Sequence, residues 1–571
     1  MKLRDALVEV APFLNRVLLF SLVTNLLVLA PSWYMMEVYD RVVNSRNYMT
    51  LLMLTVAVLG GYVVLEVLQW VRSRTMHEGS LFFDRRMRSR VFDAMFAARL
   101  KNHPAGRSMQ ALHDFRTIRD FISSSALLSL LDVPLSMLVL ILLFLMHPLV
   151  GWFAVGGALL QFLIGYFNEE RIREPLRSAS LSSLAAQQNA GGVLRNSQVV
   201  EAMGMLGAMR GRWMNLQREF LAQQAVASDA AGTNAAFSKL LQSLVTSLLL
   251  GVGCWLTLKG EMAGSGMIVG SILGGRVLSP LVQVIANWRQ IETVRDSYRR
   301  LDEVLVSLPS KEKGMPLPPP EGRLSVEGVV ATAPGGQVPI IKGASFQLAL
   351  GDSLAVVGPS ASGKTSLSRL LTGIWAPQSG TVRLDGSDVV AWDKEELGPH
   401  VGYLPQNVEL FEGTLGENIA RFGRVDADMV ARACAMAGLE GFVAGLEHGL
   451  DTMIGEDGAF LSGGQRQRVA LARAVYGTPK FVVLDEPNSS LDEQGDEALL
   501  AALGALKKMK TTVVVVTHRV NLLAVLDKML VLIDGQVRQF GSREEVLAAL
   551  QPKAKSAGAP GSHAVVRRGA E

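Results

Sequence analysis

The sequence is poor in charged residues for its length. Asp, Glu, Lys and Arg make up 19% of 571 residues, and apolar residues make up 49%. An ordinary soluble protein has about 25% charged residues, so this composition argues against a purely soluble enzyme. The formal net charge is only +4, and the basic excess lies in loops between apolar segments. We therefore expect at least two domains, one of them in a lipid bilayer, and no nucleic-acid partner.

Cysteine is scarce as well. The chain contains only Cys254 and Cys434, which have neither a paired spacing nor neighbouring metal ligands. This pattern argues against a disulfide scaffold or a zinc site and predicts two reduced thiols. No small-residue cleavage site follows the first apolar run, so we expect that run to remain attached as a membrane span.

Long apolar windows are what the chain has in abundance. They cover residues 17–36, 47–65, 133–168, 240–258 and 262–288, and His147-Pro148 divides the third window into two. A helix needs about 20 residues to cross a bilayer, so we expect six spans. Arg276 is the only charge in the last window. Because exposure of a charged side chain to lipid is costly, Arg276 should face either the translocation path or another polar group. We prefer the translocation path.

The loops differ sharply in basic residues. Residues 72–125 contain 11 Lys and Arg and residues 168–239 contain 8, whereas the three opposite loops contain three in all. The positive-inside rule then places the N-terminus and both long loops in the cytoplasm. We expect the spans to continue into these loops as helices, with residues 111–119 and 195–203 contacting the second domain.

The composition changes after residue 308. Residues 309–322 are rich in proline and charge, which predicts an extended linker between a membrane domain at 1–308 and a second domain at 323–550. In that second domain short β-branched runs alternate with helical stretches. The fold class we predict is an all-α six-span transmembrane domain followed by an α/β P-loop domain. Residues 551–571 have the composition of a disordered tail.

A glycine-rich loop follows the apolar run at residues 354–357. It comprises Gly358, Pro359, Ser360, Ala361, Ser362, Gly363, Lys364 and Thr365, and Ser366 comes next. Glycines let backbone N–H groups converge on one point at the start of a helix, where an anion is favoured. The loop predicts a triphosphate site in which Lys364 reaches the β- and γ-phosphates and Thr365 coordinates Mg²⁺.

Two adjacent carboxylates follow the apolar run at residues 481–484. Ligands of open α/β sheets bind at the carboxyl ends of strands, where Asp485 and Glu486 would stand. We expect Asp485 to hold Mg²⁺ through its water shell and Glu486 to polarise the attacking water. Without further motifs, such a pair is often only a solvated turn.

The run that follows Leu461 is more specific. It comprises Ser462, Gly463, Gly464 and Gln465, and here the chain resembles ATP-binding cassette (ABC) transporters. In that family the motif begins a helix and contacts the γ-phosphate of ATP held by the partner subunit. The single set of motifs in this chain therefore implies a half-transporter that acts as a homodimer.

Other positions match the same family one by one. Gln406 resembles the loop glutamine that senses Mg²⁺, and His518 resembles the switch histidine near the γ-phosphate. Asp492 stands in a run that resembles the loop linking the two ATP sites. The resemblance thus implies ATP and Mg²⁺ as cofactors and Glu486, His518 and Gln406 as catalytic residues. The metal ligands it implies are Thr365, Gln406 and Asp485. Residues 329–334 lack the aromatic that stacks on adenine in many relatives, so we expect apolar contacts to the base.

Two longer stretches narrow the resemblance. Residues 402–414 and 484–492 resemble the protease/lipase branch of type I secretion exporters, and residues 31–42 resemble the end of its first span. We expect no peptidase domain before that span. The resemblance implies export of an unfolded polypeptide with a C-terminal signal across the bacterial inner membrane, together with a periplasmic membrane-fusion protein and an outer-membrane channel. A lipid or small-molecule exporter shares every ATP-site motif and is the alternative. A soluble, non-transporting ABC protein would lack the spans.

Overall fold

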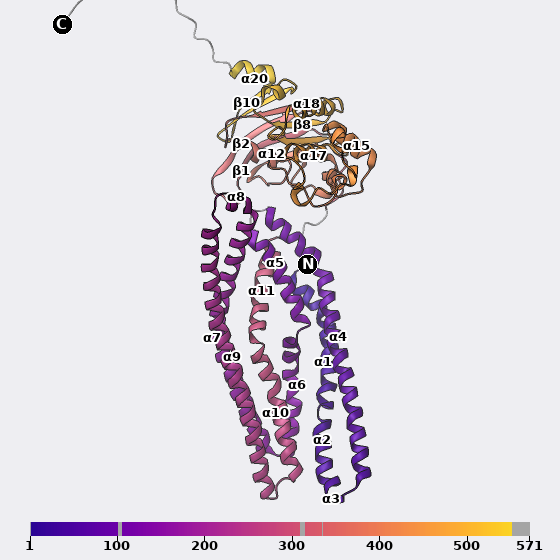
Figure 1. The fold of residues 1–571 in the computed structure, drawn as a ribbon, viewed down its shortest axis with the longest axis vertical. Coiled ribbons are helices and arrows are strands. Elements are labelled where there is room, and N and C mark those ends of the chain that lie inside the picture. The colour runs from indigo at the N-terminus through magenta and orange to yellow at the C-terminus, as the bar shows by residue number, and fades with distance from the viewer. Residues whose placement is uncertain (1, 101–104, 309–313, 334, 551–571) are drawn as a thin grey trace, which may run out of the picture. The chain divides into compact units, whose positions relative to one another are not determined.

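The computed structural model describes residues 2–100, 105–308, 314–333 and 335–550 (Figure 1). The chain divides into two compact units, Met1–Lys311 and Glu312–Glu571. The predicted tail at 551–571 and residues 309–313 of the predicted linker lie outside the described residues.

The described part of the first unit is helical. Its elements are α1 (Leu3–Leu27), α2 (Ala30–Glu37), the π-helical turn η1 (Val38–Val42), α3 (Val43–Ser45), α4 (Tyr48–Leu100), α5 (Ala105–Ile122), α6 (Ser125–Met146), α7 (Pro148–Arg195), α8 (Ser197–Ala202), α9 (Leu206–Leu258), α10 (Gly264–Ala286) and α11 (Trp288–Ser307).

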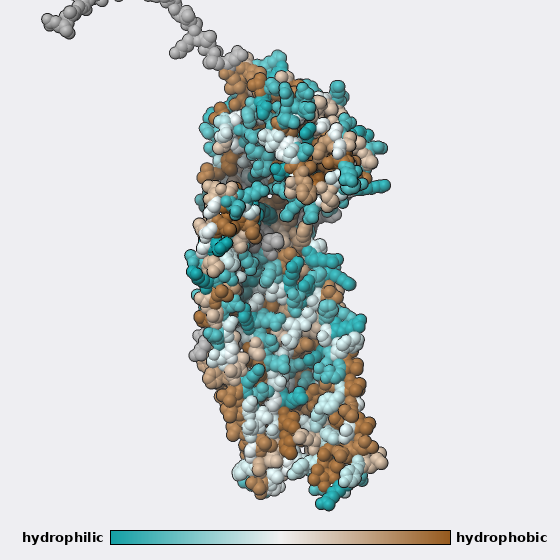
Figure 2. All heavy atoms as spheres, in the orientation of Figure 1, coloured by the Kyte–Doolittle hydropathy of each residue, from teal (hydrophilic) through white to brown (hydrophobic). Residues whose placement is uncertain are grey.

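Six helical segments of this unit are long and apolar enough to cross a membrane, which confirms the predicted number of spans. Both α4 and α9 have 53 residues, a length of about 80 Å, far more than the roughly 30 Å of a bilayer core. Most of the exposed large apolar side chains of α4 lie in its first half, among them Met49, Leu52, Met53 and Val56. Figure 2 shows hydrophobic side chains gathered toward the lower ends of the helices, near the α3 label of Figure 1. This is a membrane protein whose spans continue beyond the bilayer.

The third and fourth spans are separated as predicted. The ring of His147 accepts a hydrogen bond from Leu149 N–H (Nδ1 to N, 3.2 Å), and Pro148 occupies the first position of α7. Proline at that position has no N–H to leave unpaired, so a new helix begins without a longer loop.

Of the two segments predicted to contact the second domain, residues 111–119 are largely engaged within their own unit. Ala111, Phe115 and Ile118 are buried in a cluster formed with α1, α4 and α11. Between them Asp114, 1% exposed, pairs with Arg300 of α11 at 2.7 Å. Residues 195–203 contain the short helix α8 and are mostly exposed. The second segment therefore has the freer surface.

The second unit mixes strands and helices. Its strands are β1 (Leu324–Thr332), β2 (Pro339–Leu348), β3 (Ser353–Val357), β4 (Ser379–Leu384), β5 (Ser387–Asp388), β6 (Val401–Leu404), β7 (Phe481–Asp485), β8 (Thr512–Val516), β9 (Lys528–Ile533) and β10 (Gln536–Ser542). Its helices are α12 (Lys364–Leu371), α13 (Lys394–Leu397), α14 (Leu415–Ile419), α15 (Ala427–Met436), α16 (Glu440–Ala444), α17 (Gly463–Val475), α18 (Glu493–Lys508), α19 (Val520–Leu523) and α20 (Arg543–Leu550), with short 3₁₀ turns η2 (Gly398–His400), η3 (Gly449–Asp451) and η4 (Glu456–Gly458).

These strands form two sheets. One is antiparallel in the order β2-β1-β4-β5, and the other has the order β10-β9-β3-β8-β7-β6, parallel except for β10. Along β8, Val513 and Val515 belong to one hydrophobic core, whereas Val514 and Val516 belong to the other. A sheet covered on both faces needs apolar residues at every position, which explains the continuous runs in the sequence. The α/β prediction for this unit is confirmed.

Candidate active site

The glycine-rich loop connects β3 to α12, as its sequence predicts. A Cβ at Gly358 would lie 2.1 Å from the carbonyl oxygen of Leu532, and Gly363 has φ of +100°. Neither position tolerates a side chain, so these glycines fix the path of the loop. The ammonium of Lys364 donates to the carbonyl oxygens of Gly358 (2.8 Å) and Pro359 (2.9 Å). The lysine thus folds back over the loop, where its charge adds to that of the helix N-terminus.

Four neighbouring strands bring the predicted residues to one edge of the sheet. The order β3-β8-β7-β6 is parallel throughout, so the carboxyl ends of these strands lie side by side. The glycine-rich loop follows β3, His518 follows β8, Asp485 and Glu486 stand at the end of β7, and Gln406 follows β6. Segments separated by up to 160 residues of sequence therefore meet at the edge where α/β sheets bind ligands.

Asp485 is a buried carboxylate with unused hydrogen-bonding capacity. Asp485 is 0% exposed, and neither of its carboxylate oxygens accepts a well-oriented hydrogen bond from the described residues. Burial raises the pKa of Asp485, and the nearby Thr365 hydroxyl offsets this in part. A buried carboxylate without a partner is unfavourable, and a carboxylate beside a hydroxyl is an oxygen donor set that suits Mg²⁺. The two residues therefore fit a magnesium ion bound together with phosphates.

Glu486 is held in a strained position. Its φ is +50°, which a residue with a side chain rarely adopts, and its N–H donates to the carbonyl of Val516 at 3.0 Å. The amide of Gln406 donates to its carboxylate (Nε2 to Oε2, 3.0 Å). Two residues that the sequence assigned separately, 80 positions apart, are therefore in direct contact. The bond orients a carboxylate that could position a water molecule.

The run at residues 462–465, which we call the signature run, forms a capped helix start. Ser462 is the N-cap of α17: its hydroxyl accepts from Gln465 N–H at 3.3 Å, and the Gln465 side chain accepts from Ser462 N–H at 2.8 Å. A Cβ at Gly464 would lie 3.1 Å from the carbonyl of Ser490. The absence of side chains at Gly463 and Gly464 thus lets this helix end approach the loop after β7, and leaves its first N–H groups available to an anion.

Gln467 is a site residue that the sequence analysis missed. It is 2% exposed, and its amide donates to the carbonyls of Glu486 (3.2 Å) and Pro487 (2.6 Å). Its side-chain oxygen accepts from the Ser489 hydroxyl at 3.1 Å. Gln467 therefore ties α17 to the turn that carries Glu486. The signal was a polar residue on the buried face of α17, which includes Val469, Ala470 and Leu471.

The remaining predicted residues have distinct settings. His518 is exposed, and its neighbour Arg519 pairs with Asp496 at 3.1 Å. Asp492 is the N-cap of α18 and accepts from Gly495 N–H at 2.9 Å. The imidazole is therefore accessible to a ligand, whereas Asp492 has a structural contact in addition to any role between two sites.

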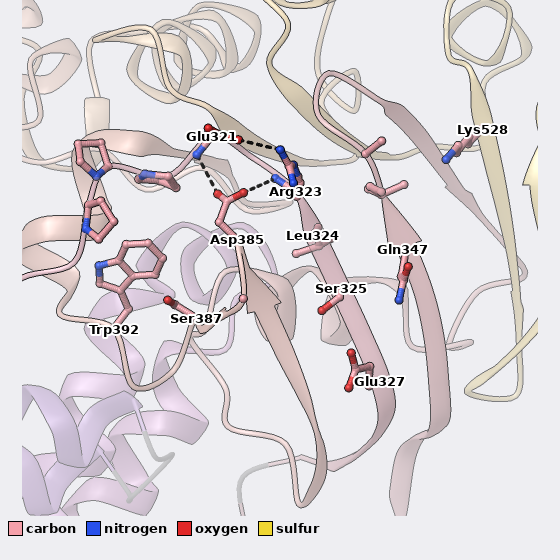
Figure 3. A pocket seen from close by; sticks show the side chains of 16 residues that line it. Glu321, Arg323, Leu324, Ser325, Glu327, Gln347, Asp385, Ser387, Trp392 and Lys528 are labelled. Carbon is pink, nitrogen blue, oxygen red and sulfur yellow. Dashed lines mark hydrogen bonds and ion pairs between the residues drawn. The ribbon is translucent and has the colours of Figure 1, made fainter.

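A separate cavity lies at the start of β1. It has a volume of about 940 Å³, and its lining includes Glu321, Trp392 and Asp385 (Figure 3). The carboxylate of Asp385 accepts from the N–H groups of Glu321 (2.8 Å), Gly322 (2.9 Å) and Arg323 (3.1 Å). Asp385 therefore fixes the chain where the proline-rich segment enters the sheet, away from the strand ends described above.

Comparison with known proteins agrees with this geometry. The ABC transporter family matches residues 341–489, and the ABC transporter transmembrane region matches residues 14–274. The chain is 38% identical to the type I secretion system ATP-binding protein PrsD of Rhizobium meliloti (strain 1021), over 93% of this chain and 92% of that protein. It is 25% identical to the leukotoxin translocation ATP-binding protein LktB of Mannheimia haemolytica, over 93% of this chain and 75% of that protein.

A solved structure has the same fold. It is a bacterial Atm1-family ABC exporter with ATP bound, with a TM-score of 0.80 and 21% sequence identity over 94% of this chain and 96% of that one.

Proposed function

Because this chain belongs to the ABC transporters, within them to the type I secretion ATP-binding proteins, we propose that it exports an unfolded polypeptide with a C-terminal signal. It is an ATPase coupled to transmembrane transport. The observation that carries the cargo class is the 38% identity to PrsD along nearly the full length of both chains. The ATP chemistry is supported by the geometry of one sheet edge, which brings together the glycine-rich loop, Asp485, Glu486 and Gln406.

The residues at this edge divide the work of ATP hydrolysis. The glycine-rich loop and Lys364 would bind the phosphates, and Thr365 and Asp485 would hold Mg²⁺, which would supply positive charge to the reacting phosphoryl group. Glu486, oriented by Gln406, accepts a hydrogen bond from the attacking water and polarises it. His518 is exposed after β8, which ends at the same edge, and would contact the γ-phosphate. Phosphoryl transfer depends on this positioning and charge rather than on a covalent intermediate.

The working unit in this proposal is a homodimer. The chain carries one phosphate loop and one signature run, so two copies are needed to enclose each nucleotide between a loop and the N-terminal end of a partner's α17. Asp492 links the two sites. ATP binding brings the two nucleotide domains together, and residues 195–203 pass this movement to the spans.

We place the protein in the bacterial inner membrane with its nucleotide domain in the cytoplasm. The concentration of basic residues in the loops at 72–125 and 168–239 supports this orientation. Its partners are a periplasmic membrane-fusion protein, an outer-membrane channel and the secreted polypeptide.

Glu486→Gln tests the assigned chemistry. The amide keeps the size of the side chain but cannot polarise water, so we expect nucleotide affinity within twofold of wild type and turnover reduced at least about 100-fold. Binding of a fluorescent ATP analogue and phosphate release by the purified full chain measure the two quantities. Turnover near the wild-type rate would show that another group activates the water.

The cargo class is tested separately. In lipid vesicles, a peptide from the C-terminus of a candidate cargo should stimulate wild-type ATPase, whereas the same residues in scrambled order should not. Stimulation by a lipid or a small molecule, without any response to the peptide, would instead favour the alternative exporter.

A further inference from the structure

A polar cavity lies among the spans of the first unit. It has a volume of about 290 Å³ and is lined from α1, α4, α6 and α10. Its charged lining residues are Arg72, Asp132 and Arg276. Pockets for whole small molecules begin near 300 Å³, so this cavity fits a group the size of one side chain with some water.

The charges in this cavity do not cancel. Arg72 pairs with Asp132 (Nη1 to Oδ1, 3.1 Å) and also donates to the Ser21 hydroxyl at 3.0 Å. Arg276 has no ion pair or hydrogen bond to another residue within the described part of the chain, although its side chain is accessible. With one negative and two positive groups, the lining has a net charge of +1.

The position of Arg276 makes its free charge significant. It is the only charged residue of α10 and stands at its thirteenth of 23 positions, about 18 Å from the first residue. An unpaired guanidinium at the middle of a span is costly unless an anion or water reaches it. The lining residue Thr24 is 5% exposed, and its hydroxyl also has no partner among the described residues. Two hydrogen-bond donors for which the described residues provide no acceptor therefore line one positively charged cavity.

We propose that this cavity binds a carboxylate of the transported polypeptide, with Arg276 as the principal contact. The ligand class rests on the proposed function: the anionic groups of an unmodified polypeptide are the side chains of Asp and Glu and the C-terminal carboxylate. A guanidinium binds a carboxylate through two parallel hydrogen bonds, and the Arg72–Asp132 pair keeps the neighbouring charge neutral.

The charge of the cavity can be tested without any cargo. In the full chain with the exposed Cys254 replaced by Ser, Ser279→Cys places a thiol in the cavity lining, while the buried Cys434 stays protected. Anionic and cationic thiosulfonate reagents then report the potential at that thiol. We expect Arg276→Gln to lower the ratio of anionic to cationic reaction rates by about tenfold, or ~1.4 kcal/mol.

Arg74→Gln is the matched control for this measurement, because Arg74 is exposed and pairs with Glu78 outside the cavity. It should leave the ratio unchanged. If Arg276→Gln also leaves the ratio unchanged, the proposal is overturned.

The ligand class is tested with peptides. Wild-type protein in lipid vesicles should bind a fluorescent C-terminal cargo peptide about tenfold tighter than the same peptide with its carboxylates converted to amides. Arg276→Gln should bind both peptides equally, and Arg276→Lys should restore part of the preference. An amide at the C-terminus alone distinguishes the terminal carboxylate from the side chains.

The outcomes separate the two proposals. Equal binding of both peptides by wild type overturns the carboxylate site but leaves polypeptide export standing. An anion preference in the thiol experiment, without binding of either peptide, overturns the assigned ligand and the proposed cargo together.

Discussion

Gln467 offers a sharp test of how the site is held together, because it connects α17 to the turn that carries Glu486. Gln467→Met keeps the shape of the side chain and removes its three hydrogen bonds. Of the three partners, Glu486 O still accepts from Ser489 N–H at 3.2 Å, and the exposed Ser489 hydroxyl can turn to water. The buried carbonyl of Pro487 is the group left without a donor.

One unsatisfied buried carbonyl costs about 1–3 kcal/mol. If the turn moves so that the Pro487 carbonyl regains a hydrogen bond, Glu486 moves with it. We then expect the activation free energy of ATP hydrolysis to rise by a similar amount. A loss of about 1–3 kcal/mol corresponds to roughly a 5- to 150-fold fall in kcat. The phosphate loop does not contact Gln467 through any hydrogen bond of the described residues, so nucleotide affinity should stay within twofold.

The assay is ATP hydrolysis and nucleotide binding by the purified full chain, together with thermal unfolding. Gln494→Met is the matched control, because Gln494 is exposed and lies near the start of α18; it should change each quantity little. Lower stability with a normal kcat would show that Gln467 only supports the fold. Normal values for both would refute the reasoning that these hydrogen bonds matter.

Three further predictions concern other contacts of this unit. Lys364→Ala removes the ammonium beside the phosphate loop and should weaken ATP binding at least about tenfold in an equilibrium binding assay; unchanged affinity would mean that the phosphates bind elsewhere. Burial raises the pKa of Asp485, so the nucleotide-free protein should lose stability as the pH rises from the ordinary pKa of Asp through the raised pKa. Asp485→Asn should remove this loss and raise the Tm, measured in chelator, by at least about 2 °C. The same substitution should abolish the stabilisation of the protein by Mg²⁺ and ATP. An Asp485→Asn protein whose Tm is equal to or below that of wild type at neutral pH would contradict it. Asp385→Ala should speed proteolysis within residues 314–323, because three backbone N–H groups lose their acceptor. Asp385→Asn should have a smaller effect. Equal proteolysis rates for wild type and both variants would count against the contact.

Local patterns in the sequence were sufficient to predict the number of spans and to nominate the side chains of the ATP site. Apolar windows near 20 residues predict membrane helices because the bilayer sets their length, and all six appear in the structure. Loops after buried strands predict ligand contacts because the carboxyl ends of parallel strands share one edge. Lys364, Asp485 and Glu486 stand at such ends.

Contacts between distant segments could not be read in this way. Nothing local to Gln406 or Gln467 indicates that both contact the Glu486 turn, since that depends on the order of β6, β7 and β8 and on where α17 packs. The apolar residues at 111–119 could equally have packed inside their own unit or on another domain. The structure shows that Ala111, Phe115 and Ile118 pack with α4 and α11. Contact of this segment with the second domain stays a prediction.

The sequence alone thus determined which groups we propose to bind phosphate and which segments are long and apolar enough to cross a membrane, because both follow from residue type and spacing along the chain. Tertiary structure decided which groups meet. Arg72 pairs with Asp132, 60 residues further along the chain, whereas Arg276 in the same cavity has no partner among the residues that the structure describes. The physical reason is that the strength of a charge or a hydrogen bond depends on what packing places within about 3 Å of it, and packing is not encoded at any single position.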